Sequence, residues 1–210
     1  MDLSKSLKSY LEELSSNSPT PGGGNVAALS GSLACNLGIM VCNLTIGKKK
    51  YLDVEEEMKL TKSKLEEYND CFLELAIKDN YAFDQVMAAF KLRKETDEQK
   101  KIRSEKIEEA TFAAAVVPSE VIETCRKVIP HLETISQKGN QNSLSDAGVG
   151  LSLLATAAEG AILNVIINCT SLTNKTLGLE LMKKSEIIYE EVKNMSGKLI
   201  SDIKSKLYNS

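Results

Sequence analysis

Apolar residues recur along most of the chain at the three- and four-residue spacing of amphipathic helices, and no run alternates between apolar and polar residues as a half-buried strand does. The clearest apolar stripe belongs to a helix predicted over about residues 54–94. Its members are Leu65, Tyr68, Phe72, Leu75, Asp79, Ala82, Val86 and Phe90. Asp79 is therefore a carboxylate at a position where the period calls for an apolar side chain.

Two segments are apolar on nearly every side, which predicts two central helices. The first covers about 25–46 and has no charged residue before its basic end; the second begins at Ser143 or Ser145, ends near 172, and carries only Asp146 and Glu159. Small residues recur along the first at positions 27, 31, 34 and 38, so another backbone can approach it closely. This segment is long enough to span a bilayer. Its asparagine, serine and threonine residues instead favour a buried helix, and we expect no membrane association.

Amphipathic segments flank these two. A short first helix is predicted, followed by a break over residues 15–24, SSNSPTPGGG. The apolar face of that helix is formed by Leu3, Leu7, Leu11 and Leu14.

Later in the chain a helix begins near Thr96, carries Arg103 on its buried face and is expected to kink at Pro118, with a separate short segment over 131–138. A last helix is predicted over about 175–208. Its inward residues are Leu181, Ile188, Val192, Met195, Leu199 and Ile203. These elements predict an all-α fold, a single-domain helical bundle over residues 1–210. The two buried, nearly uncharged helices also indicate a homodimer interface.

Composition narrows the classes of function. The 210 residues are 42% hydrophobic and 26% charged, with a net charge of -3, which is globular and argues against a general nucleic-acid binder. Five cysteines without a C-x-x-C pair, together with a single histidine, argue against a zinc site, so we expect no metal. Reduced thiols and a start without signal-peptide layout indicate a cytoplasmic protein.

Several polar residues could carry chemistry. Burial raises the pKa of a carboxylate, so Asp79 either pairs with a cation such as Arg103 or serves as an acid or base near neutral pH. Asp146 follows Ser145 at a predicted helix start, where it suits either a cap or a site. Asn164 and Asn168 are one turn apart on an apolar helix, so their amides bind either a polar ligand or backbone.

Two loops offer further contacts. The Gly22-Gly23-Gly24 turn can bring backbone amides close to a ligand, although it lacks the spacing of a P-loop. The basic run that begins Lys48-Lys49 is either a solvated helix end or a contact for a carboxylate-bearing ligand. Asn142 lies in the polar loop before the second apolar helix.

The stretch from Ser18 to Tyr51, SPTPGGGNVAALSGSLACNLGIMVCNLTIGKKKY, resembles the formiminotransferase–cyclodeaminase C-terminal family, which includes stand-alone bacterial methenyltetrahydrofolate cyclohydrolases. Shorter pieces recur in the family's order: Asp79-x-x-Ala82-Phe83, Arg103 before an alanine-rich helix, Val117-Pro118, Asn142-x-x-Ser145-Asp146-Ala147 and Asn164-Val165-x-x-Asn168. One departure is Arg93, where the family pattern has proline, so the loop there and its substrate contacts are expected to differ.

The resemblance implies an all-helical homodimer that acts on one-carbon units of tetrahydrofolate without a metal or redox cofactor. Cyclodeamination closes 5-formimino-tetrahydrofolate to the methenyl form and releases ammonia; cyclohydrolysis converts the methenyl form to 10-formyl-tetrahydrofolate. Both reactions pass through a tetrahedral carbon between two folate nitrogens and need proton transfer. The residues do not separate the two reactions, and a non-catalytic folate-binding or scaffold dimer is the alternative.

Roles follow for the matching residues as hypotheses. Asp79 becomes the principal acid/base, and Asp146 its partner or the anchor of the pterin ring. The expected substrate-binding residues are Gly22, Gly23, Gly24, Lys48, Lys49, Arg103, Asn142, Ser145, Asn164 and Asn168. Among them, the cationic side chains would meet the glutamate tail, and the asparagines would position water or ammonia.

Overall fold

A computed structural model describes residues 5–209, and within that range the chain forms α-helices and 3-10 turns but no strand. The helices are α1 (Leu7–Leu14), α2 (Gly23–Thr45), α3 (Glu55–Phe90), α4 (Asp97–Lys138), α5 (Leu144–Ser171) and α6 (Lys175–Tyr208), with 3-10 turns η1 (Lys49–Val54) and η2 (Gln141–Ser143). The predicted all-α bundle is confirmed.

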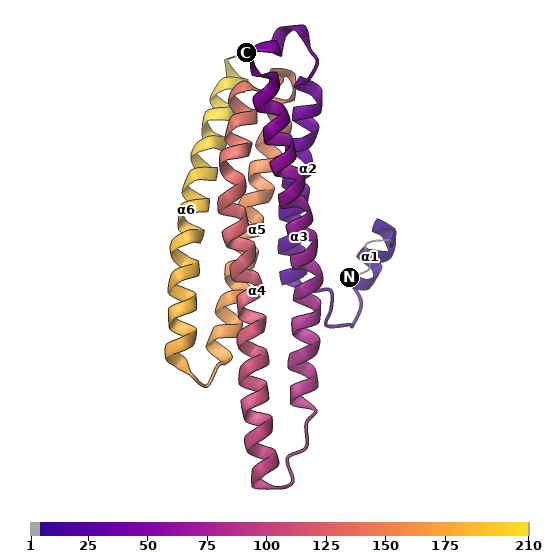
Figure 1. Ribbon diagram of the computed structural model, residues 1–210, viewed down its shortest axis with the longest axis vertical. Helices are drawn as coiled ribbons and strands as arrows, with labels where there is room; N and C mark the ends of the chain where they lie inside the picture. The colour runs from indigo at the N-terminus through magenta and orange to yellow at the C-terminus, as the bar shows by residue number, and fades with distance from the viewer. Residues whose placement is uncertain (1–4, 210) are drawn as a thin grey trace.

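The five long helices run side by side in alternating directions (Figure 1). Helix α2 packs against α3 and α5, while α5 also contacts α4 and α6. Helices α3 and α4 extend beyond the others as a long hairpin, and α1 stands apart from the bundle, joined to it by the loop before α2 (Figure 1). The alternating directions place the start of α2 and the end of α5 at one level of the bundle, and the end of α2 and the start of α5 at the other.

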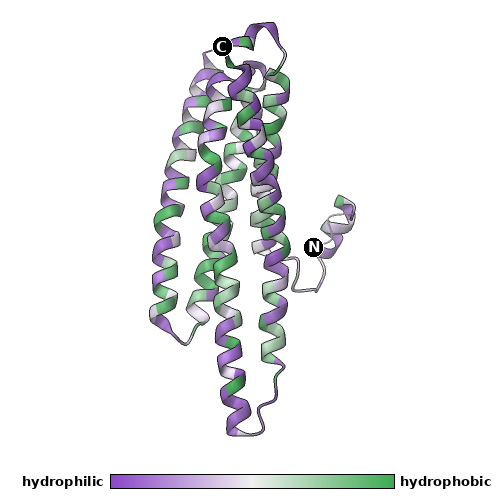
Figure 2. Ribbon diagram, viewed as in Figure 1, coloured by the Kyte–Doolittle hydropathy of each residue, from purple (hydrophilic) through white to green (hydrophobic). Residues whose placement is uncertain are grey.

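The two nearly uncharged helices differ in burial: only 44% of the apolar window of α5 is buried inside the bundle, and Leu163 and Ile167 on it are exposed. The small residues of α2 admit close neighbours: a Cβ at Gly31 would lie 2.6 Å from Cζ of Phe72, and one at Gly38 would lie 2.7 Å from Cδ1 of Leu65. Helices α2 and α5 are each long and apolar enough to cross a membrane by length and composition, and 61% of the apolar window of α2 is buried inside the bundle. Hydrophobic residues predominate along α5, whereas hydrophobic and polar residues alternate along α6 (Figure 2).

Helix α4 corrects one prediction, and the kink expected at Pro118 stays a prediction. It runs without interruption from Asp97 to Lys138, with Pro118 and Pro130 inside it, so residues 131–138 are its last turns rather than a separate segment. A proline removes one helical hydrogen bond. Ile129 and Leu132, on both sides of Pro130, are fully buried, so their packing compensates for the lost hydrogen bond. The start near Thr96 is confirmed by a capping box with Gln99.

Three apolar faces were assigned in part wrongly. In α1, Leu7 and Leu11 are exposed and Tyr10 is the buried residue; Leu3 lies outside the described residues. Phe90, at the end of the α3 stripe, and Met195, in α6, are also exposed. Phe90 lies on the projecting hairpin, where helices α2, α5 and α6 no longer cover α3 (Figure 1).

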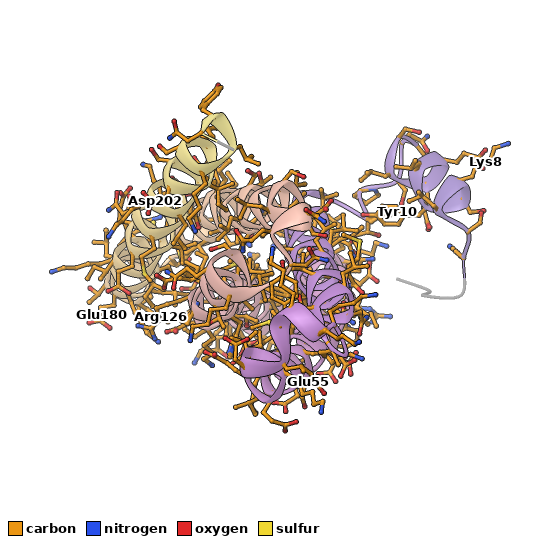
Figure 3. All side chains as sticks on the ribbon, turned by 90° about the horizontal axis from the view of Figure 1, so that it is seen from above. Lys8, Tyr10, Glu55, Arg126, Glu180 and Asp202 are labelled. Atoms are coloured by element: carbon orange, nitrogen blue, oxygen red, sulfur yellow. The ribbon has the colours of Figure 1, made fainter. Side chains whose placement is uncertain are left out.

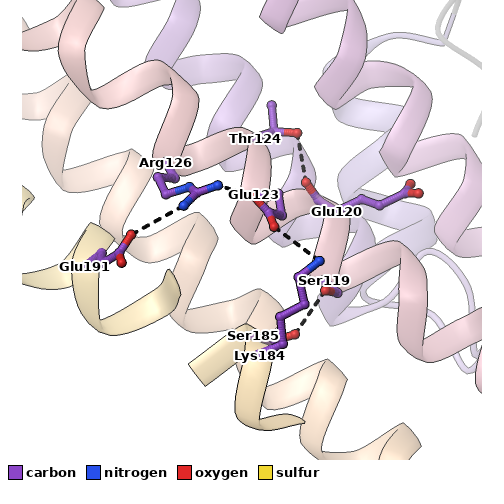
Figure 4. Close-up of polar contacts among 8 residues, drawn as sticks. All are labelled: Ser119, Glu120, Glu123, Thr124, Arg126, Lys184, Ser185 and Glu191. Atoms are coloured by element: carbon purple, nitrogen blue, oxygen red, sulfur yellow. Dashed lines mark hydrogen bonds and ion pairs between the residues drawn. The ribbon is translucent and has the colours of Figure 1, made fainter. Parts of the chain in front are cut away.

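Polar contacts fix α6 on α4. The hydroxyl of Ser185 donates to Ser119 over 3.0 Å inside the interface, and Lys184 forms an ion pair with Glu123 at 3.5 Å (Figure 4). Arg126 bridges Glu123 and Glu191 at the edge of the same contact. This network lies between α4 and α6.

Candidate functional site

Asp79 lies on α3 against the first turn of α2. The carboxyl group fills the space beside Gly24, where a Cβ would lie 2.7 Å from its Cγ and 2.9 Å from its Oδ2. The backbone N–H of Asn25 donates a hydrogen bond to it. Asp79 is only partly buried, and this burial raises its pKa above the usual range, while the Asn25 hydrogen bond opposes the rise. The carboxylate thus lies at the positive end of the α2 dipole.

No cation neutralises Asp79 within residues 5–209, so the predicted alternative of an ion pair with Arg103 is wrong. Arg103 instead lies in the hairpin, where its guanidinium donates to the backbone carbonyl of Phe90 over 3.1 and 3.3 Å and lies 5.5 Å from the centre of the Phe90 ring. Arg103 thus supplies a donor to a carbonyl that has no helical partner at the C-terminal end of α3, and its side chain is only half-buried.

The glycine turn and Asn164 of α5 lie side by side at this site. Gly22 is the N-cap of α2, and Gly23 and Gly24 form its first turn. The amide nitrogen of Asn164 lies 3.5 Å from where a Cβ on Gly23 would be. That amide also donates to the carbonyl of Gly160 within α5.

Asn168 serves the backbone instead. Its amide donates to the carbonyl of Ala114 in α4 over 2.9 Å, which ties α5 to α4 one turn beyond Asn164. The sequence left open whether the Asn168 amide binds a polar ligand or backbone, and the geometry supports backbone binding.

Two residues next to Asp79 escaped sequence reasoning. The Asn25 side chain accepts a hydrogen bond from the Tyr10 hydroxyl over 2.9 Å and donates one to the carbonyl of Ala76 over 2.7 Å. Asn25 is completely buried, and Tyr10 is 7% exposed. Tyr10 is on the side of α1 that faces the bundle, whereas Lys8 points away (Figure 3). Residue 25 begins the helix predicted over about 25–46, but the apolar pattern carried no signal for contacts with Tyr10 and Ala76.

A second group of predicted residues gathers at the opposite level of the bundle. Lys48 and Lys49 follow the end of α2, and Asn142, Ser145 and Asp146 lie in η2 and the first turn of α5. Within residues 5–209, none of these five side chains forms a hydrogen bond or ion pair. Their donors and acceptors are thus available to a ligand.

The frame beneath this second group is well ordered by hydrogen bonds. The Tyr51 hydroxyl accepts from the backbone N–H of Gln141 over 3.1 Å, and Thr45 accepts from that of Asn140 over 2.9 Å. These bonds fasten the loop before α5 to the end of α2, so the free side chains are presented from a fixed backbone.

One chain does not bring Asp79 and Asp146 together. Asp146 and Asn164 are eighteen residues apart on α5, which is about 27 Å along a helix, and Asn164 is at the Asp79 level. A direct pairing of these carboxylates within one chain is therefore excluded.

One cavity adjoins the turn of α3 that carries Asp79. A cavity of about 220 Å³ under α1 is lined by Tyr10, Pro21, Asn80 and Asp84, among others. The side-chain oxygen of Asn80 is buried and has no hydrogen-bond partner in the described chain. A second cavity, of about 340 Å³, lies in the hairpin between Gln85 and Lys106.

The histidine and the cysteines are placed elsewhere. His131 packs against Tyr68 at a ring distance of 5.7 Å, and burial lowers its pKa. All five cysteines are free, and burial raises the pKa of Cys35 to about 12. A Cys–His catalytic pair has no support in this arrangement.

The comparisons with known proteins agree on one family. The formiminotransferase-cyclodeaminase family model matches residues 6–186. The chain belongs to this family. It is 39% identical over 203 residues to the methenyltetrahydrofolate cyclohydrolase of Methylorubrum extorquens, a match that covers 97% of this chain and 98% of that protein.

Two further members frame the comparison. The crystal structure of formiminotetrahydrofolate cyclodeaminase from Thermotoga maritima superposes with a TM-score of 0.80 at 32% identity, covering 95% of this chain and 98% of that one. The formimidoyltransferase-cyclodeaminase of Rattus norvegicus is 28% identical over 204 residues, but this chain spans only 38% of it. The family thus contains both activities on chains of this length.

Proposed function

We propose that this chain is an enzyme of tetrahydrofolate one-carbon metabolism that acts on the carbon between two folate nitrogens, with Asp79 as its acid/base. The full-length match to a methenyltetrahydrofolate cyclohydrolase supports hydrolysis of the methenyl form to 10-formyl-tetrahydrofolate as the first reading. The observation that carries the chemistry is a partly buried carboxylate with no cationic partner in the described chain, held at the glycine turn of α2.

In the hydrolytic reaction Asp79 takes a proton from a water molecule while the oxygen of that water bonds to the methenyl carbon. The resulting tetrahedral carbon then loses one C–N bond as its hydroxyl group becomes the formyl C=O. Asp79 returns its proton to the departing nitrogen, the hydroxyl proton passes to solvent, and the formyl group stays on the other nitrogen. A carboxyl group serves both steps best when its pKa approaches the working pH, which burial favours here.

Cyclodeamination is the second candidate, and the Thermotoga maritima structure favours it. In that reaction the free folate nitrogen adds to the carbon of the protonated formimino group, and Asp79 accepts the proton of that nitrogen. Asp79 then gives this proton to the NH2 group of the tetrahedral carbon, which leaves as ammonia and yields the methenyl cation. Asn164 would orient the ammonia or water beside Gly23 in either case. Neither reaction requires a metal or redox cofactor.

The second group supplies the binding contacts of this proposal. Asp146 would grip the amide-like edge of the pterin with paired hydrogen bonds, and Ser145 and Asn142 would support it. Lys48 and Lys49, exposed and unpaired in residues 5–209, would meet the glutamate tail. Arg103 is occupied by the Phe90 carbonyl and is a weaker candidate for that contact.

We further propose a homodimer in which each site takes Asp79 from one protomer and Asp146 from the other. Helices α2 and α5 are in contact, and their outward sides carry large exposed aliphatic side chains: Leu33, Met40 and Leu44 on α2, and Val149, Leu163 and Ile167 on α5. Such a face usually marks an interface. A two-fold axis across these helices would lay the start of one α2 beside the end of the other. The Asp79 site of one protomer would then meet the Asp146 group of its partner, although the two groups lie about 27 Å apart within one chain.

The free state of all five thiols supports a reducing, cytoplasmic location.

The test of the function is one assay of the near-ultraviolet band of methenyl-tetrahydrofolate with purified protein. Loss of the band faster than in buffer supports the cyclohydrolase. Gain of the band from 5-formimino-tetrahydrofolate with ammonia release supports the cyclodeaminase. Acceleration of neither would contradict both and favour a non-catalytic folate-binding dimer.

A further inference from the structure

Asn25 is the polar side chain that joins three helices at the Asp79 site. It belongs to the first turn of α2, accepts from Tyr10 of α1 over 2.9 Å and donates to Ala76 of α3 over 2.7 Å. Its own backbone N–H donates to Asp79. One fully buried residue therefore contacts the carboxylate directly and is held from two sides.

The geometry of the Ala76 contact explains why this matters for Asp79. Ala76 precedes Asp79 by three residues, about one helical turn, so the Asn25 amide fixes the α2 backbone against the turn of α3 that carries the carboxylate. Gly24 lets the two approach until the carboxyl group occupies the space of a Cβ. The Asn25 side chain thus ties the N–H that donates to Asp79 to the turn of α3 that carries the carboxylate.

The Tyr10 contact adds the N-terminal helix to the same arrangement. Helix α1 projects from the bundle, and its leucines Leu7 and Leu11 are exposed, so little apolar burial holds it in place. Tyr10 is its one buried residue in the described range, and the phenol oxygen reaches the side-chain oxygen of Asn25 (Figure 3 shows its direction). A buried amide oxygen needs such a donor.

We propose that Asn25 is a positioning residue for Asp79 and that the Tyr10 hydroxyl of α1 holds it in place. The inference rests on the proposed role of Asp79. It assigns a function to a helix whose apolar face contributes little to the core, and it predicts that two side chains that touch no reacting atom control turnover.

The test is a double-mutant cycle on methenyl-tetrahydrofolate hydrolysis, or on cyclodeamination if that is the reaction found. Asn25→Ala should lower kcat roughly 10- to 100-fold with little change in KM, since it displaces the acid/base and not the binding groups. Tyr10→Phe, which keeps the buried ring, should lower kcat about 3- to 10-fold. In the Asn25→Ala background Tyr10→Phe should have no further effect, because the hydroxyl acts only through Asn25.

Two controls separate positioning from loss of stability. Ser185→Ala removes a buried hydroxyl hydrogen bond between α4 and α6, and Lys8→Ala changes the outer side of α1. Both variants should keep the kcat of the unmodified protein.

Equal losses of kcat in Ser185→Ala and Tyr10→Phe would overturn the proposal, as would additive effects in the cycle. If Asp79→Asn is inactive while Asn25→Ala and Tyr10→Phe turn over normally, this inference fails and the role of Asp79 stands. If Asp79→Asn is fully active, the role of Asp79 itself fails.

Discussion

The carboxyl group of Asp79 occupies the space that a β-carbon on residue 24 would need, so Gly24 is the residue that lets α3 present an acid at the start of α2. The pair joins a motif that looks like a flexible loop in the sequence to a carboxylate fifty-five residues further on. Residue 24 thus has no room for a side chain while Asp79 keeps its position.

Gly24→Ala should therefore lower both turnover and stability. The new methyl group would lie 2.7 Å from Cγ of Asp79, so the carboxyl group must move. Overpacking of this kind costs roughly 1–3 kcal/mol. Thermal unfolding and kcat measure the two effects. Gly197→Ala on α6 is the matched control, because a Cβ there has no neighbour within 4 Å and should stabilise the helix by about 0.5–1 kcal/mol. Unchanged kcat in Gly24→Ala would count against the close approach.

Asp79→Asn should raise the melting temperature at pH 7. Burial raises the pKa of Asp79 in the folded state, so the folded protein disfavours the charged form. The penalty is fully present above the folded pKa and disappears as pH falls below the ordinary value of 3.8. The gain in the variant should accordingly shrink at acidic pH. Asp70→Asn, an exposed change on the same helix, should give no such pH-dependent gain. A lower melting temperature of Asp79→Asn at neutral pH would contradict the assigned direction.

Mixed dimers test whether a site is shared between protomers. Asp79→Asn and Asp146→Asn should each be inactive alone. After unfolding and refolding together, half of the dimers are heterodimers with one intact site each, so about one quarter of the unmodified activity should return. No recovery, with mixed dimers shown to be present, would place both residues in the same protomer's site or outside it.

A charge on the exposed α2–α5 face should separate the protomers. Leu33→Glu changes a leucine that is 49% exposed in the single chain, midway along α2. A carboxylate buried between two copies is strongly unfavourable, so we expect a monomer by sedimentation velocity at micromolar concentration. Ile187→Glu, on α6 and 56% exposed, should leave the dimer intact. A dimer that tolerates Leu33→Glu but not Ile187→Glu would move the interface to α6.

Local patterns were sufficient for the helices and for Asp79. The small residues of α2 and the break in the α3 stripe are properties of short stretches, and both correspond to close packing and to a partly buried carboxylate. The Thr96 cap is likewise local. The continuity of α4 was not local, because burial on both sides of Pro130 decides whether a proline ends a helix.

Contacts between distant segments could not be predicted in the same way. The choice between Tyr10 and its neighbouring leucines as the buried side of α1 depends on Asn25, fifteen residues away. The distance between Asp79 and Asp146 follows from the direction of α5, which a motif in each helix does not contain. Arg103 has the spacing of a buried residue, but the hairpin leaves it with a carbonyl partner instead of a carboxylate.

The most direct test of the central claim compares Asp79→Asn with the unmodified protein in the methenyl-tetrahydrofolate assay, with the buffer rate subtracted. The substitution keeps the shape of the side chain and removes its ability to exchange a proton. We expect kcat to fall at least 100-fold while KM changes little and the helical circular dichroism is retained. Full turnover by a folded Asp79→Asn would contradict Asp79 as the acid/base of this enzyme.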